Sequence, residues 1–195
     1  SFSVIQTIDT GYFITGFLDV SASGGEGNDG GTDGRPKSIT AKHGVGEYWG
    51  IKLDSQGQTV WRRYFGGSNN DRSYDVVQSS DGDIIMMGSS ESDDFDITNP
   101  KGSYDFWVVK VSSQGNMIWQ KNFGGSSIDI GYSGTKTMSD DFVFAGDTRS
   151  NDGDIGQHKG NSDYWLVKFD DNSNLIWQHT YGGGGFDSAR SVIEL

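Results

Sequence analysis

Short apolar and β-branched runs, separated by polar turns, recur along the whole chain. In the middle of the chain four such runs occupy residues 74–78, 84–88, 104–111 and 117–123. The first two flank a turn with an Asp-Gly pair at Asp81 and Gly82, a strong hairpin signal. The last two flank a turn in which Gly115 supplies the required positive φ. The pattern predicts four antiparallel strands, two tight hairpins and a longer loop at 89–103.

The third of these runs is apolar on both of its faces. Its alternating residues are Trp107, Val109 and Val111 on one side and Phe106, Val108 and Lys110 on the other. Runs with the same alternation lie at 49–53 and 165–169. A strand that is apolar on both faces belongs to a sheet that is covered on both sides.

The four-run pattern repeats with a step of 58 residues. The positions that carry it are Trp49, Trp107 and Trp165; Trp61, Trp119 and Trp177; the Gly-Gly pairs at 66, 124 and 182; and Asp71, Asp129 and Asp187. The repeats occupy approximately residues 3–73, 74–131 and 132–189, and 190–195 resembles the start of a next repeat. A fixed period of this length indicates one supersecondary unit used several times.

The predicted fold is all-β: an arc of three four-stranded antiparallel propeller blades plus the first strand of a fourth, in one segment spanning 1–195. The first repeat carries 14 extra residues within 18–43, in the loop between its second and third strands. Three blades do not close a ring, so either further blades follow in the same protein or a second copy completes a six-bladed ring. The strand-like residues at 191–195 favour a continuing chain.

Composition narrows the range of molecules that the protein is expected to bind. The net charge of −12 disfavours nucleic acid and anionic membrane surfaces, which attract positive charge. The chain has no cysteine, and therefore neither disulfides nor thiolate metal sites. No apolar stretch is long enough to span a membrane, and no signal peptide is visible.

One segment of the third repeat resembles a known family. It comprises 163–170, Ile176-Trp177-Gln178, Gly182-Gly183 and, ahead of them, 150–155. These residues resemble the tandem β-propeller repeats of large secreted and cell-surface proteins of Bacteroidetes, often exported through type IX secretion. The resemblance covers essentially the whole chain. It implies an extracellular scaffold or adhesion module and supplies no catalytic residue.

Acidic loop residues are the candidates for a Ca²⁺ site. Asp94 and Asp96, and Asn151, Asp152 and Asp154, place oxygen atoms about two residues apart, and Ca²⁺ takes six to eight such ligands. Asp29, Asp33 and Asp93 belong to the same acidic loops. The competing interpretation is that these residues only form turns.

The recurring residues are predicted to be structural. Asp71, Asp129 and Asp187 are expected to bond loop amides, and the six tryptophans to pack blade against blade. Tyr12, Phe95 and Phe186 are the candidate aromatic contacts for a sugar. His43, His158 and His179 stand at non-matching positions, and no spacing selects a nucleophile, a zinc site or a carboxylate pair.

The sequence therefore predicts a non-enzymatic, extracellular or cell-surface binding or adhesion module, whose acidic loop face meets a carbohydrate, a protein or Ca²⁺. One alternative is part of a propeller enzyme, sugar-active or quinone-dependent, whose site is incomplete in this chain. The other is a purely structural spacer.

Overall fold

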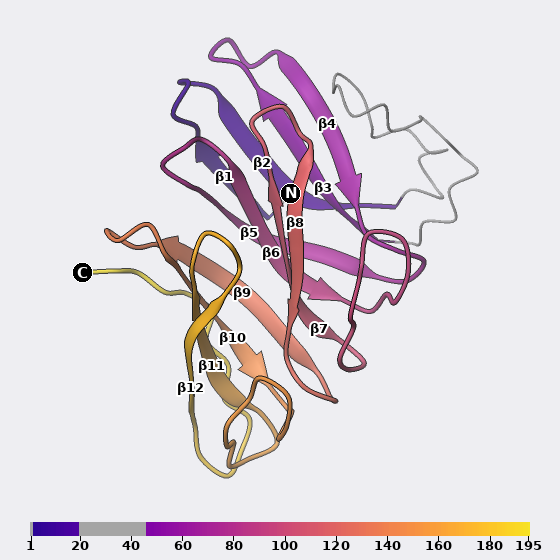
Figure 1. The fold of residues 1–195 in the computed structure, drawn as a ribbon, viewed down its shortest axis with the longest axis vertical. Helices are drawn as coiled ribbons and strands as arrows, with labels where there is room; N and C mark the ends of the chain where they lie inside the picture. Colours follow the sequence, from indigo (N-terminus) through magenta and orange to yellow (C-terminus); the bar gives the residue numbers. More distant parts are fainter. Residues whose placement is uncertain (1, 20–45) are drawn as a thin grey trace.

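Three four-stranded antiparallel sheets follow one another along the chain in this computed structural model, which describes residues 2–19 and 46–195 (Figure 1). The first sheet contains β1 (Ser3–Gln6), β2 (Tyr12–Leu18), β3 (Glu47–Leu53) and β4 (Thr59–Phe65). The second contains β5 (Asp71–Gln78), β6 (Ile84–Ser90), β7 (Asp105–Val111) and β8 (Met117–Phe123). The third contains β9 (Asp129–Lys136), β10 (Phe142–Thr148), β11 (Asp163–Phe169) and β12 (Leu175–Tyr181). The described part of the chain contains no helix.

The prediction of three all-β units of four strands is confirmed, with two differences at strand ends. β5 begins at Asp71, three residues before the predicted run at 74. Its first residues are polar but pair with β6, so hydrophobicity alone does not reveal them. The predicted strand at the end of the chain is also absent: residues 190–195 are described but form no strand. The first strand of a unit is held in place by pairing with the second strand of the same unit. The described residues contain no second strand with which residues 190–195 could pair.

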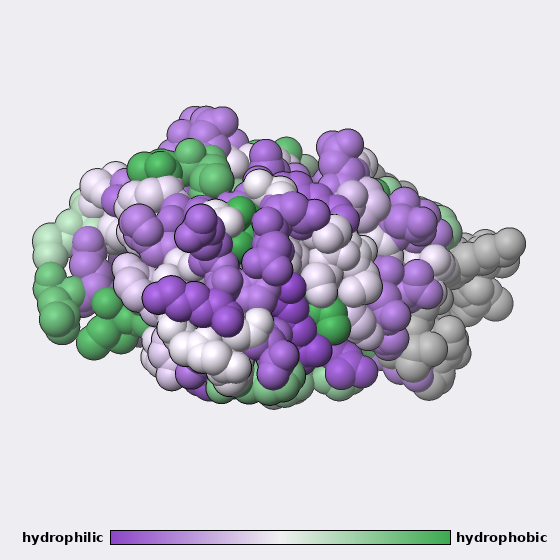
Figure 2. Space-filling view, turned by 90° about the horizontal axis from the view of Figure 1, so that it is seen from below, coloured by the Kyte–Doolittle hydropathy of each residue, from purple (hydrophilic) through white to green (hydrophobic). Residues whose placement is uncertain are grey.

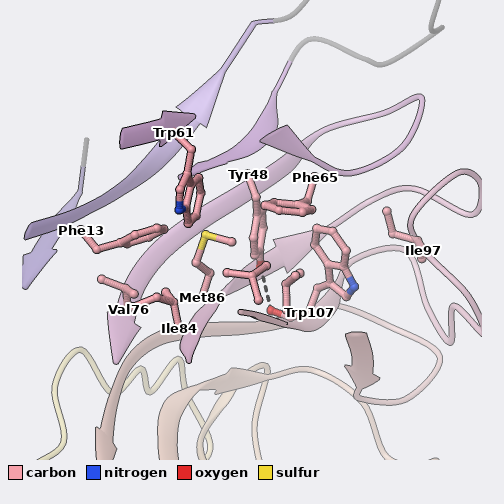
Figure 3. Packing of buried hydrophobic residues seen from close by; sticks show 11 residues of the cluster. Phe13, Tyr48, Trp61, Phe65, Val76, Ile84, Met86, Ile97 and Trp107 are labelled. Atoms are coloured by element: carbon pink, nitrogen blue, oxygen red, sulfur yellow. Dashed lines mark hydrogen bonds between the residues drawn. The ribbon is translucent and has the colours of Figure 1, made fainter. Parts of the chain in front are cut away.

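Each sheet packs against the next through a cluster of apolar side chains. The first cluster joins the first and second sheets and contains Tyr48, Trp61, Met86 and Trp107 among others (Figure 3). The Tyr48 hydroxyl donates a hydrogen bond of 2.7 Å to the carbonyl oxygen of Trp107 across this interface. The second cluster joins the second and third sheets. We call the face that a sheet turns toward the next sheet its forward face, and the opposite face its backward face.

The alternation seen in the sequence sorts side chains between these two faces. Trp107, Val109 and Val111 enter the first cluster, whereas Phe106 and Val108 enter the second. All seven residues of β6 and of β7 are buried. The second sheet is thus covered on both sides, as predicted for a strand with two apolar faces.

The connections divide between the two ends of each sheet. The β1–β2 and β3–β4 hairpins and their equivalents lie at one end, which we call the hairpin end. The Gly-Gly links between sheets and the loops between second and third strands lie at the other, which we call the corner end. Most of the 18–43 segment of the first unit, with Asp29, Asp33 and His43, lies outside the described residues.

Candidate functional site

An aspartate holds each Gly-Gly link at the corner end. In each link the backbone N–H of the second glycine donates to the aspartate four residues later. These bonds are Gly67 to Asp71 Oδ2 (2.7 Å), Gly125 to Asp129 Oδ2 (2.8 Å) and Gly183 to Asp187 Oδ2 (2.8 Å). The same short-range hydrogen bond thus recurs in all three links. It is the bond from a loop amide that the sequence predicts for the recurring aspartates.

A second loop then closes over two of these links. We call this arrangement the corner clasp: residues 92–96 on link 66–71, and residues 150–154 on link 124–129. In the first clasp, Gly66, Ser68 and Asn69 donate their N–H groups to Asp96 Oδ2 (3.2 Å), Asp94 Oδ1 (2.7 Å) and Ser92 Oγ (2.9 Å). In the second, Gly124, Ser126 and Ser127 donate to Asp154 Oδ2 (3.1 Å), Asp152 Oδ1 (2.7 Å) and Ser150 Oγ (2.9 Å). The clasp therefore ties each of these loops to the link that precedes its own sheet.

The clasp occupies the carboxylates that were the Ca²⁺ candidates. Asp94, Asp96, Asp152 and Asp154 each accept a backbone N–H, and Asp154 also forms an ion pair with Lys101. Asn151 is exposed at the loop surface. Within 2–19 and 46–195, no three His, Cys, Asp or Glu side chains are grouped so as to hold a metal ion.

We therefore expect Ca²⁺ to leave thermal stability unchanged. The melting temperature in 5 mM EDTA and in 5 mM CaCl₂ should agree to within about 1 °C, because only a ligand bound by the folded state stabilises it. Matched ionic strength controls for screening of the negative charge. A rise of several degrees specific to Ca²⁺ over Mg²⁺ would show that the clasp carboxylates turn toward a metal instead.

Burial changes the proton affinity of the corner carboxyls. Loss of hydration raises the pKa of Asp71 to about 6, against hydrogen bonds from Gly67 and Ser92 that favour the ionised form. Burial likewise raises the pKa of Asp129 and of Asp105. The corner end thus contains one carboxyl, Asp71, that takes up a proton in mild acid, and two more whose pKa is raised by burial.

The protein should be more stable at pH 5 than at pH 7.5. Because the folded-state pKa of Asp71 lies above the ordinary 3.8, the folded state binds more protons between these two values, and stability rises as pH falls. For Asp71 alone we expect about 1–2 kcal/mol between the two pH values, measured by urea unfolding. Asp71→Asn should reduce this difference. Asp93→Asn, which removes the same formal charge from an exposed neighbouring position, should leave it in place.

Carboxyl groups whose pKa is lowered in the folded protein do not cancel this gain in stability at pH 5. The Lys52 ammonium and the Thr7 hydroxyl hold the pKa of Asp9 at about 2, so Asp9 stays ionised over the whole range. A stability that falls from pH 7.5 to pH 5 would contradict the assigned burial of the corner carboxyls.

The three aromatic candidates for sugar contact do not form one site. Phe95 is 51% exposed in the loop of the first clasp, at the corner end of the second sheet. Phe186 is 68% exposed in the third link, where the Arg149 guanidinium lies 5.2 Å from its ring centre. Tyr12 starts β2 and therefore lies at the hairpin end. A single ligand platform made from all three is excluded by this separation.

The six tryptophans differ in burial according to sheet position. Trp61, Trp107 and Trp165 are at most 1% exposed, and Trp119 is partly buried against the second cluster. The first and the last, Trp49 and Trp177, are also only partly buried. Their position on the two outer sheets accounts for this exposure, because no described sheet covers the face that each of them occupies.

The hairpin end holds a charged tie between units that the sequence did not single out. The Lys110 side chain is 3% exposed, and its ammonium lies 2.7 Å from both carboxylate oxygens of Asp171 in the third unit. Asp83 lies 3.3 Å away, within the second unit. The lysine thus neutralises acidic groups from two units.

A small polar hollow lies at the corner end of the second sheet. It has a volume of about 120 Å³ and is lined by Thr98, Asn99, Lys101, Gln120, Lys121 and Asn122. Asn122 is 3% exposed and donates from Nδ2 to the carbonyl oxygen of Thr98 (2.9 Å). Its Oδ1 atom is buried and accepts no hydrogen bond from the described residues. Such an acceptor is costly to bury and is usually satisfied by another group.

Sequence reasoning missed this hollow because it breaks the repeat. The positions equivalent to Asn122 are Tyr64 and Thr180. An amide side chain at one of three equivalent positions is a weak signal of a binding site, and it is the signal that the sequence contains for this hollow.

Comparison with known proteins adds no relative. Neither the protein-family models nor the curated proteins gave a match to this chain. Within the described residues there is likewise no helix of the length and apolar character needed to cross a membrane.

Proposed function

We propose that this chain is a non-enzymatic binding module of a propeller-like repeat protein, and that its ligand is a carbohydrate bound at the corner end. The propeller-like arrangement is supported by three equivalent four-stranded sheets packed face to face in sequence order. A position outside the cell is part of the proposal and is supported by the resemblance of the repeats alone.

The observation that carries the ligand class is the wholly polar lining of the hollow. The amide of Gln120 and the ammonium groups of Lys101 and Lys121 can donate to sugar oxygens, while the side-chain oxygens of Thr98 and Asn99 can accept from sugar hydroxyls. The hollow is smaller than the roughly 300 Å³ of a typical small-molecule pocket. It therefore fits one end of an extended ligand whose remainder lies on the surrounding loops.

A glycan array with the labelled 195-residue chain tests this proposal. Asn122→Leu should weaken binding to any positive glycan about tenfold, because it removes the hydrogen bond that holds the Thr98 backbone at the wall of the hollow and leaves that carbonyl oxygen unsatisfied. Gln178→Ala is the matched control: Gln178 makes in the third sheet the contact to Trp165 that Gln120 makes to Trp107 in the second, outside the hollow. A blank array would reject the binding role.

The second candidate is a structural spacer, and the corner clasp favours it. The clasp uses the recurring serine and aspartate side chains of two units to hold loops to links. A protein whose only role is to extend from a cell surface needs such stabilising hydrogen bonds but needs no ligand. A blank array together with an intact fold would leave this role in place.

A further inference from the structure

The polar hollow at the corner end of the second sheet is lined by positive charge in a protein that is otherwise acidic. The sequence has 27 acidic side chains against 15 lysines and arginines. Of the six residues that line the hollow, two are lysines, Lys101 and Lys121, and none is acidic. The charge of the lining is thus opposite to that of the whole chain. A local excess of positive charge is the feature that attracts an anionic group.

The ammonium groups of these two lysines are available to a ligand. The Lys121 ammonium lies 5.9 Å from the ring centre of Phe123, and no carboxylate of residues 2–19 and 46–195 forms an ion pair with it. The Lys101 ammonium pairs with Asp154 of the third unit, whose Oδ2 atom also accepts the N–H of Gly124. An ammonium group carries three N–H donors, so Lys101 keeps donors that Asp154 does not use.

The loop that forms one wall of the hollow is fixed at both of its ends. At one end, Asn122 donates to the carbonyl oxygen of Thr98 (2.9 Å), and the amide nitrogen of Gln120 donates to the Thr98 hydroxyl. At the other end, the backbone N–H of Lys101 donates to Oδ2 of the buried Asp105 (2.7 Å). A wall held in this way loses little conformational freedom when a ligand binds.

The orientation of the Gln120 amide adds a further donor. Its Oε1 atom accepts the indole N–H of Trp107 (2.8 Å), which fixes the positions of the amide oxygen and nitrogen. Its Nε2 atom has two N–H groups and gives one of them to Thr98. The second N–H can donate to a ligand. The amide and the two ammonium groups together supply donors suited to a group that only accepts hydrogen bonds.

The size of the hollow and the surface around it match an acidic sugar. A volume of about 120 Å³ admits one substituent of a sugar ring, such as a carboxylate or a sulfate ester. Hydrogen bonds to such charged groups are stronger than those to neutral hydroxyls. The corner ends of β8 and β10 point downward in Figure 1, and Figure 2, a view from below, shows mainly hydrophilic residues over the middle of that side. The rest of a hydrated polysaccharide would therefore meet a polar surface.

We propose that the hollow binds the acidic group of an anionic carbohydrate, a uronic acid carboxylate or a sulfate ester, with Lys121 and Lys101 as its cationic contacts. This inference rests on the proposed carbohydrate-binding function and names the ligand class of the same site. The net charge of −12 repels an anionic ligand at longer range. Salt screens that repulsion beyond about 8 Å at about 0.15 M ionic strength, so binding is best measured at this concentration.

An array of neutral, carboxylated and sulfated glycans, probed with the 195-residue chain, tests the ligand class. The glycans that bind should carry a carboxylate or a sulfate, and they should bind at least tenfold more tightly than the same glycans after carboxyl reduction or desulfation. These two treatments distinguish the two acidic groups. Binding confined to neutral glycans would overturn the acidic class and leave the carbohydrate-binding function in place. A blank array would reject both.

Two matched variants test the part played by the hollow. Lys121→Gln should weaken binding of an acidic glycan about tenfold and leave binding of its neutralised form unchanged, because one charge-assisted hydrogen bond is lost. Lys159→Gln removes the same charge from the exposed position of the third unit that is equivalent to Lys101, and it should leave both affinities unchanged. Circular dichroism establishes that each variant is folded.

The pattern of losses separates this inference from the function on which it rests. If Asn122→Leu weakens binding while Lys121→Gln does not, the hollow binds a carbohydrate but the acidic class is wrong. Equal losses from Lys121→Gln and Lys159→Gln would show a general effect of net charge, and would also overturn the inference. A loss confined to Lys121→Gln and to the acidic form of the glycan is the result that supports it.

Discussion

Trp107→Ala should lower the free energy of unfolding by about 3–5 kcal/mol, the range for deletion of a fully buried large aromatic side chain. The Trp107 side chain is fully buried in the first cluster, and its ring centre lies 4.5 Å from that of Tyr48. Its indole N–H also donates to Gln120 Oε1 (2.8 Å). The substitution leaves a cavity between two sheets and an acceptor without its donor. Urea unfolding followed by circular dichroism measures the loss.

Two further variants separate these contributions. Trp107→Phe keeps most of the ring volume and loses the N–H donor, so its cost should be well below that of the alanine variant. Ile118→Ala, at a 49% exposed position of the same sheet, should change stability by about 0.5 kcal/mol or less. A Trp107→Ala variant that loses less than about 1 kcal/mol would show that the two sheets are not packed through this residue.

Gly88→Ala should be nearly as damaging, although it adds only one methyl group. An added Cβ would lie 1.8 Å from the carbonyl oxygen of Arg72. That oxygen belongs to the backbone of β5, next to a register shift between Ser73 and Asp75, and cannot rotate away. The strand itself must move, at a cost of about 3 kcal/mol. Thermal and urea unfolding should both report this loss.

The rest of the chain offers controls for this prediction. Gly146, the equivalent of Gly88 in the third sheet, would place a Cβ 1.7 Å from the carbonyl oxygen of Ile130, so Gly146→Ala should have a similar effect. Gly184→Ala meets no atom within 4 Å and should be close to neutral. Equal effects at Gly88 and Gly184 would mean that the strand contact is absent in solution.

Much of the fold could be predicted because it depends on two repeat periods of the sequence, one of two residues and one of 58 residues. Alternation with period two assigned Trp107 and Phe106 to opposite faces, and the 58-residue step identified three equivalent units. The start of β5 could not be predicted in this way, because Asp71 and Ser73 are polar residues inside a strand. Tertiary pairing with β6 outweighs their composition.

The candidate site was less predictable because an aspartate oxygen serves several partners equally well. Asp94 and Asp96 suit a metal ion or an amide, and the choice depends on Gly66 and Ser68, which lie nearly 30 residues earlier. Only the fold brings these groups together. Asn122 raises the same difficulty, since its unsatisfied oxygen is a property of burial rather than of residue type.

The corner clasp also has a mechanical consequence. It joins a loop of one sheet to the link that leads into that sheet, and each core cluster joins two neighbouring sheets, so the clasps and the clusters connect only consecutive units. A chain pulled by its two ends would then give way one unit at a time. The second and third units would each release 58 residues, or roughly 200 Å of extended chain, and the first unit, with its 14 extra residues, would give a longer step in a force–extension trace.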